Sequence, residues 1–360
     1  MTFAPKGPRL AYIDWARGLA VLLMIEAHTV DAWTSAAARR SVAYRDAIVL
    51  GGFAAPLFLW LAGLGVVLSA TAVVRRGGGR REAAGAVCRR GLEIFVLAFL
   101  FRLQAFIVSP GSHPITIFRV DILNIMGPAI VAAGVVWAFV ESPVLLGACY
   151  AALAGGVAMV SPIVRTIGAV DRLPVWVQWY IRPAAEYTTF TAFPWAGFVF
   201  AGAGLGVVLV TTRAGRSRVH AAVAAAGLTL VWVGFYTASL PTIYRESSFW
   251  TSSPTYFAIR VGVMVTALAV LYGLEQLATR YGMTLPALQL FGRRSLFVYW
   301  IHVELVYGYA AWPIRGKLSM WGVGLAYVAF SSVMYWAAVA FDRWRAARPQ
   351  ITFQNKVQAV

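Results

Sequence analysis

The chain has 360 residues, of which 60% are hydrophobic and only 12% charged, and its mean hydropathy is +0.71. A soluble domain of this length does not carry so much apolar surface, so the composition excludes a soluble enzyme and indicates a polytopic membrane protein. The net charge of +17 then indicates cytoplasmic loops and anionic lipid headgroups rather than nucleic acid, which we do not expect as a partner.

Ten segments are apolar over the roughly 20 residues that an α-helix needs to cross a bilayer. The sequence therefore predicts an all-α, polytopic integral membrane protein with about 10 transmembrane helices. A single transmembrane domain would occupy 1–345, and 346–360 would form a short cytoplasmic tail. The expected spans are 11–31, 47–72, 90–109, 119–140, 143–163, 191–211, 219–240, 255–275, 288–310 and 319–340.

The distribution of basic residues orients these spans. With both termini cytoplasmic, 18 of the 31 Lys and Arg residues fall in inner segments, 9 in outer segments and 4 within spans. Lys and Arg are enriched in cytoplasmic loops, so this bias favours both termini inside. The first span has no cleavage site before it and is expected to stay as an anchor. Cys88 and Cys149 are expected to be free thiols.

The first span, "DWARGLAVLLMIEAH", carries four ionisable side chains where apolar ones would be cheaper. Arg17 and His28 are eleven residues apart, which returns them to nearly the same helix face. Asp14 with Arg17, and His28 with Asp31, are spaced i,i+3, so each pair can meet on the surface of the helix. Glu26 points elsewhere and needs its own partner.

Further polar side chains gather in the outer half of the expected bundle. Charges within a bilayer usually face a protein interior or a water-filled cavity. A polar pocket that opens to the outside is the economical interpretation; mutual neutralisation in a buried network is the alternative. These candidates for an acceptor site are Arg102, Arg119, Asp121, Asn124, Arg260 and Glu304, and His302 lies near them, slightly beyond the midplane.

The loop over 75–90 holds arginine pairs around "GGG". Arginine pairs with phosphate, and glycine lets a backbone approach it closely, so Arg75, Arg76, Arg89 and Arg90 are candidates for binding a phosphorylated donor. A cytoplasmic loop that touches anionic lipid would have the same composition. The four histidines show no spacing typical of a zinc site, so no metal is predicted.

An Arg followed by ten residues and a His at the start of the first span resembles the acyltransferase-3 family of membrane acyltransferases. The longer pattern is more similar to the bacterial relatives of heparan-α-glucosaminide N-acetyltransferase. The similar segments are "RLAYIDWARGLAVLLMIEAH", "GGFAAPLFLWLAG", "RVDILNIMG", "FPWAGFVFAGAGLG", "FWTSSPTYFAIRVG" and "FGRRSLFVYWIH". They occur in this order out to about residue 310.

The resemblance implies transmembrane acetyl transfer, from cytoplasmic acetyl-CoA to a sugar or glycan on the other side of the cytoplasmic (inner) membrane. The eukaryotic enzyme has its catalytic histidine in the first outer loop, but the loop over 32–46 holds none here. In the acyltransferase-3 family the first-span histidine is catalytic, and it corresponds to His28. The position that matches His28 in the eukaryotic enzyme is an asparagine.

These observations assign His28 as the base or acetyl relay, with Asp31 and His302 as further catalytic candidates. Asp14 and Arg17 either hold the nucleotide end of CoA or form a structural ion pair. The competing interpretation is a transporter that uses the intramembrane His, Asp and Glu residues as a proton relay. Duplicated halves, which many transporters have, are not visible in the sequence.

Overall fold

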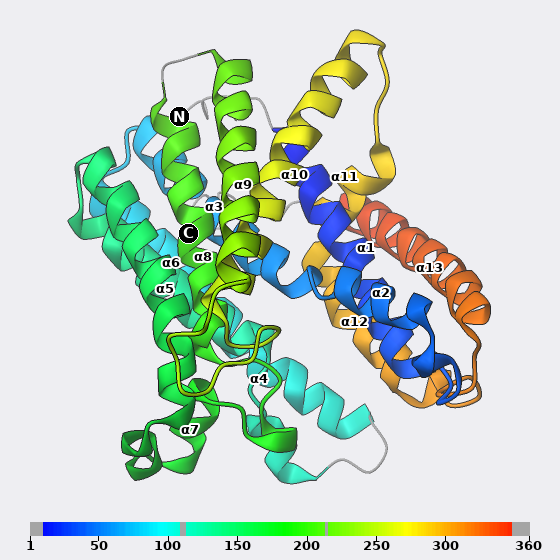
Figure 1. The fold of residues 1–360 in the computed structure, drawn as a ribbon. Helices are drawn as coiled ribbons and strands as arrows, with labels where there is room; N and C mark the ends of the chain where they lie inside the picture. The colour runs from blue at the N-terminus through cyan, green and yellow to red at the C-terminus, as the bar shows by residue number, and fades with distance from the viewer. Residues whose placement is uncertain (1–9, 109–112, 213–214, 348–360) are drawn as a thin grey trace, which may run out of the picture.

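The computed structural model describes residues 10–108, 113–212 and 215–347. Within these residues the regular secondary structure is helical, and the β-structure consists of two isolated β-bridges. The predicted cytoplasmic tail lies outside the described residues from 348 onward. The helices are α1 (Ala11–Trp33), α2 (Val42–Gly51), α3 (Ala54–Arg75), α4 (Arg80–Val108), α5 (Ile122–Phe139), α6 (Pro143–Thr166), α7 (Val175–Ile181), α8 (Ala192–Thr211), α9 (Arg216–Ala238), α10 (Pro254–Arg280), α11 (Pro286–Arg293), α12 (Ser295–Tyr307) and α13 (Met320–Ala347) (Figure 1).

Eight helical segments of the described chain are long and apolar enough to cross a membrane, when α2 and α3 are counted together. The all-α, polytopic membrane class predicted from the sequence is confirmed. The two remaining expected spans correspond to α1, which carries four charged side chains, and to the segment over 288–310. That segment breaks at Arg294, so α12 has only 13 residues and is roughly 20 Å long.

Glycines set how closely the helices approach one another. α3 crosses α8 at Gly63 and Gly202, where an added Cβ would collide with the carbonyl oxygens of Val199 and Trp60. Trp60 is fully buried at this crossing. Small residues let helix backbones meet in membranes, where packing rather than hydrophobicity drives helix association. α3 and α8 therefore form a rigid centre for the bundle.

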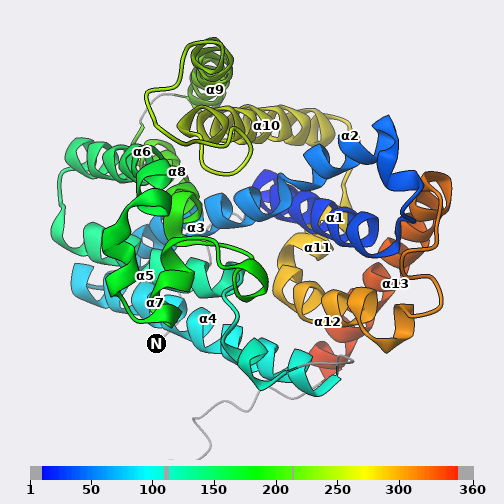
Figure 2. The same cartoon turned by 60° about the horizontal axis from the view of Figure 1, so that its bottom comes forward.

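The helices fall into two groups when the molecule is viewed from its lower end in Figure 1. Figure 2 shows α4 to α8 on one side and α1, α2 and α11 to α13 on the other, with α3 running between them. The segment that joins α2 to α3, at Gly52 and Phe53, interrupts one expected span over 47–72. Broken helices in membranes are tolerated where they are buried in protein or line a cavity.

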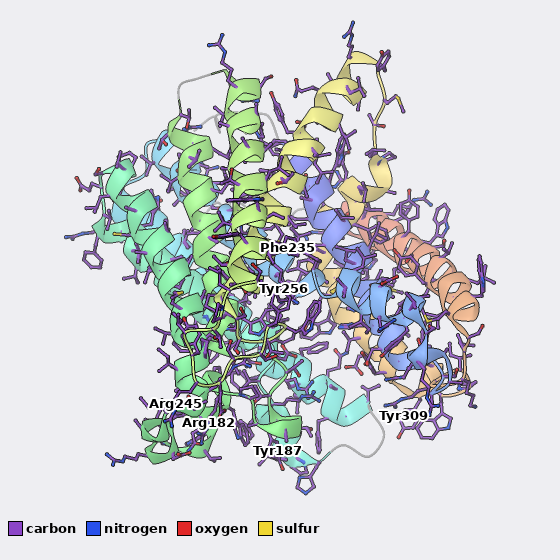
Figure 3. All side chains as sticks on the ribbon, in the orientation of Figure 1. Arg182, Tyr187, Phe235, Arg245, Tyr256 and Tyr309 are labelled. Atoms are coloured by element: carbon purple, nitrogen blue, oxygen red, sulfur yellow. The ribbon has the colours of Figure 1, made fainter. Side chains whose placement is uncertain are left out.

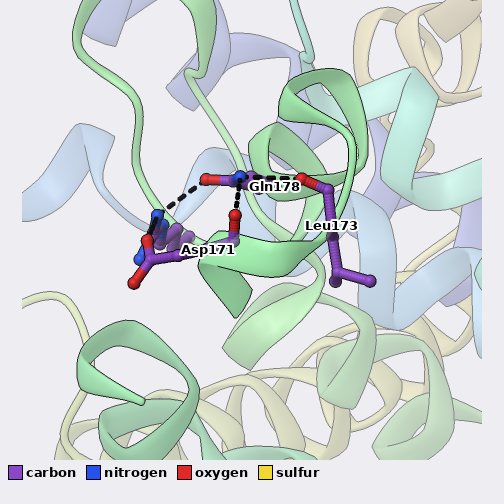
Figure 4. A network of polar contacts seen from close by, with 4 residues as sticks. Asp171, Leu173 and Gln178 are labelled. Atoms are coloured by element: carbon purple, nitrogen blue, oxygen red, sulfur yellow. Dashed lines mark hydrogen bonds and ion pairs between the residues drawn. The ribbon is translucent and has the colours of Figure 1, made fainter. Parts of the chain in front are cut away.

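The long segment between α6 and α8 folds over the end of the bundle that the topology assigns to the outside. Figure 4 shows its polar network: Gln178 Nε2 donates to the carbonyls of Asp171 and Leu173, and Arg182 donates to Gln178 Oε1 at 2.6 Å and to the Asp171 carboxylate. Figure 3 shows the labelled Arg182, Tyr187, Arg245 and Tyr309 at this same end. In this segment Trp176 is exposed, whereas Trp179 is buried and stacked on Tyr187.

Candidate functional site

Helix α1 is held at its inner end by two neighbours. Glu275 of α10 accepts hydrogen bonds from the backbone N–H groups of Ala11 (2.8 Å) and Tyr12 (3.3 Å), which have no partner within the helix. About two turns further along, Gly18 packs against the backbone of Leu288, in the first turn of α11, which ends at Arg293. These contacts fix the depth and rotation of α1, and with them the position of every polar side chain it carries.

The Asp14 and Arg17 side chains form the ion pair that their i,i+3 spacing predicts, at 3.7 Å. Asp14 is buried, and its backbone carbonyl faces Gly292. The Arg17 side chain is 34% exposed and lines a large cavity. The pair therefore combines both sequence interpretations: Asp14 is packed into the protein, and Arg17 is presented to open space.

A cavity of about 1180 Å³ runs between the two groups of helices, and we call it the central cavity. α1, α3, α4, α5 and α12 contribute most of its wall, and Thr189, just before α8, and Trp195, in the first turn of α8, also line it. Of the fifteen side chains predicted for the site, nine line it: Arg17, His28, Asp31, Arg90, Arg102, Arg119, Asp121, Arg260 and Glu304. The structure thus brings Arg17 and His28, from the two ends of α1, to one continuous space.

His28 lies against His302 across this cavity wall. His28 Nδ1 is 2.9 Å from His302 Nε2, and the two rings are nearly parallel, with an interplanar angle of 2°. His302 is completely buried, whereas His28 keeps some exposure and lines the cavity. We call the two the histidine dyad. His28 belongs to α1 and His302 to α12, and the two residues are 274 positions apart in the sequence.

The backbone around His302 determines where the protons of the dyad lie. His302 Nδ1 is 2.9 Å from the carbonyl oxygens of both Val298 and Tyr299, and these oxygens can only accept. In a neutral imidazole one nitrogen donates and the other accepts. His302 Nδ1 must therefore carry the proton, Nε2 accepts from the Nδ1–H of His28, and His28 Nε2 retains its lone pair. The dyad thus presents an unprotonated nitrogen from the residue that lines the cavity.

Asp31 lies one turn beyond His28, but its hydrogen-bond partner is Tyr307. The Tyr307 hydroxyl donates to Asp31 Oδ2 at 2.7 Å, and its ring meets the His28 ring edge-on at 5.6 Å. The contact that orients His28 thus comes from His302, and Asp31 contributes to the cavity wall beside it. Sequence reasoning missed Tyr307, because only the packing of α12 against α1 brings its hydroxyl to Asp31.

A second polar cluster forms where α5 begins. Asp121 caps α5, accepting from the N–H of Leu123 at 3.1 Å, while Asn124 Oδ1 accepts from the N–H of Asp121 at 3.0 Å. The Arg102 guanidinium interacts electrostatically with the buried Asp121 carboxyl. Tyr299 hydrogen-bonds with the same carboxyl. Asn124 is 1% exposed and does not line the central cavity, so its described role is the helix cap.

Two further arginines line the outer part of the cavity through different partners. Arg119 Nε donates to the hydroxyl of Thr189 at 3.2 Å. The Arg260 guanidinium lies 4.0 Å from the ring centre of Tyr256 and 5.8 Å from that of Trp195. Cations are attracted to aromatic faces at such distances. Arg260 Nε is buried and has no hydrogen-bond partner among the described residues.

The basic loop is mostly turned away from the cavity. Arg75, Arg76 and Arg89 are exposed and do not line it. Arg90 lines it and pairs with Glu93 at 3.0 Å on the surface. Glu26, which needed its own partner, has a buried Oε2 with no hydrogen bond within the described chain. Cys88 and Cys149 are free, and the described residues contain no group of three or more His, Cys, Asp or Glu suited to a metal ion.

The family model "Heparan-alpha-glucosaminide N-acetyltransferase, catalytic" matches residues 9–237, which is more than half of the chain. The match includes Arg17, His28 and Asp121, whereas Arg260, His302 and Glu304 lie beyond it. No curated protein matches the sequence. The match agrees with a multi-pass bundle whose polar side chains converge on one cavity. The chain therefore belongs to the heparan-α-glucosaminide N-acetyltransferase catalytic family and is a multi-pass membrane acyltransferase.

Proposed function

We propose that the protein transfers the acetyl group of cytoplasmic acetyl-CoA to a hydroxyl or amine of a sugar or glycan on the opposite side of the membrane. The observation that carries this proposal is the central cavity, because it contains both Arg17 and the histidine dyad. These two sites lie eleven residues apart on α1, which corresponds to roughly 17 Å along the helix axis. A donor held at one end could thus present its thioester at the other.

The donor end lies around Arg17. Acetyl-CoA carries several phosphates, and a guanidinium binds phosphate through two parallel hydrogen bonds. Arg17 and Arg90 both line the cavity, while Asp14 fixes Arg17 through their 3.7 Å ion pair. We assign Arg75, Arg76 and Arg89, which face away from the cavity, to the anionic surface of the inner leaflet. With both termini cytoplasmic, this end faces the cytoplasm of the inner membrane, as the Lys and Arg distribution supports.

The reacting atom is His28 Nε2. In direct transfer it removes the proton from the acceptor hydroxyl or amine as the oxygen or nitrogen attacks the thioester carbonyl. The carbon–sulfur bond then breaks, and the proton passes from His28 to the departing CoA thiolate, so that CoA–SH and the acetylated sugar leave. Holding both substrates in one cavity supplies much of the rate, since the thioester is already activated. Alternatively, Nε2 attacks the thioester carbonyl itself, the carbon–sulfur bond breaks and CoA leaves as the thiol after taking up a proton. The acceptor then attacks the acetyl-imidazole, the carbon–nitrogen bond to His28 breaks, and the acceptor proton replaces the one that CoA took up.

The acceptor end lies around Asp31, Arg119, Arg260 and Glu304, which line the cavity beside the dyad. Carboxylates and guanidinium groups hydrogen-bond to sugar hydroxyl and amino groups, and Trp195 and Tyr256 offer aromatic surface beside Arg260. We propose that these side chains position the acceptor.

Release of CoA by the purified protein in nanodiscs tests the proposal. His28→Ala should reduce turnover by about 10²–10⁴-fold, the usual contribution of a general base. Arg17→Ala should raise the KM for acetyl-CoA, while Arg76→Ala serves as the matched control because Arg76 is exposed and outside the cavity. Failure of the wild-type protein to bind or consume acetyl-CoA with any sugar acceptor would overturn the proposal.

A single-turnover experiment separates the two chemical routes. Mixed with acetyl-CoA but no acceptor, a protein that forms acetyl-His28 releases one equivalent of CoA per chain and retains the acetyl group. A protein that uses direct transfer releases no CoA under these conditions. His28→Ala should abolish the burst if it exists.

A further inference from the structure

We propose that the groove between the α6–α8 pair and the α9–α10 pair is a binding site for an anionic phospholipid of the cytoplasmic leaflet. This apolar groove is a second cavity, of about 910 Å³, and it is separate from the central cavity. No residue lines both cavities, so the proposed lipid site is independent of the proposed acetyl transfer.

The arrangement of the helices produces this groove. α9 packs along α10, with Gly227 against the backbone of Gly262, so the two form a tight pair. Figure 2 shows this pair along one side of the molecule, with α9 at its edge. Phe257 of α10 touches Phe198 of α8, with ring centres 4.5 Å apart. Many of the residues that line the space between the pairs are small, such as Ala154, Gly204 and Ala222.

Hydrogen bonds link the two helix pairs at the outer end of the groove. Arg165 of α6 donates two hydrogen bonds to Thr251, each of 2.9 Å, one to its hydroxyl and one to its carbonyl. The Tyr244 hydroxyl donates to the carbonyl of Met159 at 2.9 Å. These bonds join the end of α6 to the segment between α9 and α10. At the inner end, the described residues form no hydrogen bond between α6 or α8 and α9 or α10. A ligand therefore enters from the bilayer or from the inner end.

The polar side chains that line the groove lie at its inner end. Every lining residue is apolar or glycine except Thr212 and Arg218, which lie where α8 ends and α9 begins. Arg218 is exposed, and among the described residues no carboxylate pairs with it. A guanidinium that no described carboxylate neutralises, above an apolar groove about one leaflet deep, matches a phosphate headgroup above acyl chains. Because no acidic side chain of the described residues offsets this charge, the site favours a lipid with net negative charge.

The length of the groove agrees with an acyl chain of one leaflet. The α9 residues that line it extend from Arg218 to Leu230, which is roughly 18 Å along the helix. The hydrocarbon core of a bilayer is about 30 Å thick, so one leaflet accounts for about half of that. The groove therefore suits chains that reach from the inner headgroup region to slightly beyond the midplane.

Thermal unfolding of the delipidated protein in detergent, titrated with phosphatidylglycerol or with phosphatidylcholine, tests this site. A ligand that binds only the folded state raises Tm with concentration. We expect phosphatidylglycerol to raise Tm more than phosphatidylcholine does, and Arg218→Gln to remove the difference. Arg216→Gln is the matched control, since Arg216 is equally near the start of α9 but does not line the groove.

A second pair of variants tests the acyl portion. Ala222→Phe fills the groove and should abolish the response to both lipids, whereas Ala225→Phe, an exposed position on α9 outside the groove, should not. Native mass spectrometry should detect retained phosphatidylglycerol on the wild type and on Ala225→Phe only. Equal responses to the two lipids, equal effects of Arg216→Gln and Arg218→Gln, or retention by Ala222→Phe would each overturn the proposal.

Discussion

Replacement of His302 offers the sharpest test of the histidine dyad. His302→Phe keeps an aromatic ring at a fully buried position but removes the acceptor for the Nδ1–H of His28. His302→Gln keeps an acceptor, because its side-chain oxygen can receive that proton. A buried donor left without its partner costs about 1–3 kcal/mol. At 1.4 kcal/mol per factor of ten, this predicts a roughly 5- to 150-fold loss of CoA release for His302→Phe and a smaller loss for His302→Gln.

The assay is CoA release in nanodiscs, with thermal unfolding of each variant as the control for folding. Because His302 acts through His28, its loss should lower kcat while leaving the KM for acetyl-CoA near the wild-type value. The loss should also remain smaller than that caused by His28→Ala, which removes the reacting nitrogen itself. An unchanged rate in His302→Phe, or equal losses in the Phe and Gln variants, would refute the assignment of protons within the dyad.

Three further predictions concern the supports of the site. Tyr307→Phe and Asp31→Asn should show coupled effects on acetyl transfer, because a double-mutant cycle across their 2.7 Å hydrogen bond is expected to give about 1 kcal/mol; additive effects would contradict the contact. Glu275→Ala should lower stability by about 1 kcal/mol through loss of the α1 cap, whereas Glu275→Gln, which keeps an acceptor, should be closer to wild type in thermal unfolding. Gly202→Ala should destabilise by about 1–3 kcal/mol because its Cβ would meet the Trp60 carbonyl, while Gly156→Ala, which faces open space and lines neither cavity, should be nearly neutral; equal Tm values would count against the α3–α8 packing.

The sequence predicted those features that depend on local composition and helical periodicity. The apolar runs gave the membrane class, and the eleven-residue spacing gave the shared orientation of Arg17 and His28, which both line the central cavity. The i,i+3 spacing of Asp14 and Arg17 predicted their ion pair. Each of these follows from one helix considered by itself.

The features that escaped prediction depend on contacts between distant segments. The i,i+3 rule suggested Asp31 as the partner that orients His28, but α12 brings His302 to His28 Nδ1 and Tyr307 to Asp31. Periodicity within α1 carries no information about a helix 274 positions away. The break at Arg294 was also missed, because hydropathy over 288–310 remains high while the Arg294 side chain pairs with Asp342 of α13.

The same limit applies to the side chains near Asn124. Asn124 was grouped with the acceptor candidates because it is polar within an apolar span, yet it completes a capping box with Asp121 at the start of α5. An Asp directly before an apolar helical run is a recognisable N-cap signal. Sequence reasoning could have used it.

Sidedness is the most direct measurement of the central claim. Proteoliposomes with uniformly oriented protein would receive radiolabelled acetyl-CoA on the side that exposes the α3–α4 loop, and glucosamine on the other side. We expect labelled acetyl-glucosamine to accumulate only in the compartment that holds the sugar, and His28→Ala to prevent its formation. Product that forms only when donor and acceptor share one side would contradict transfer through the central cavity.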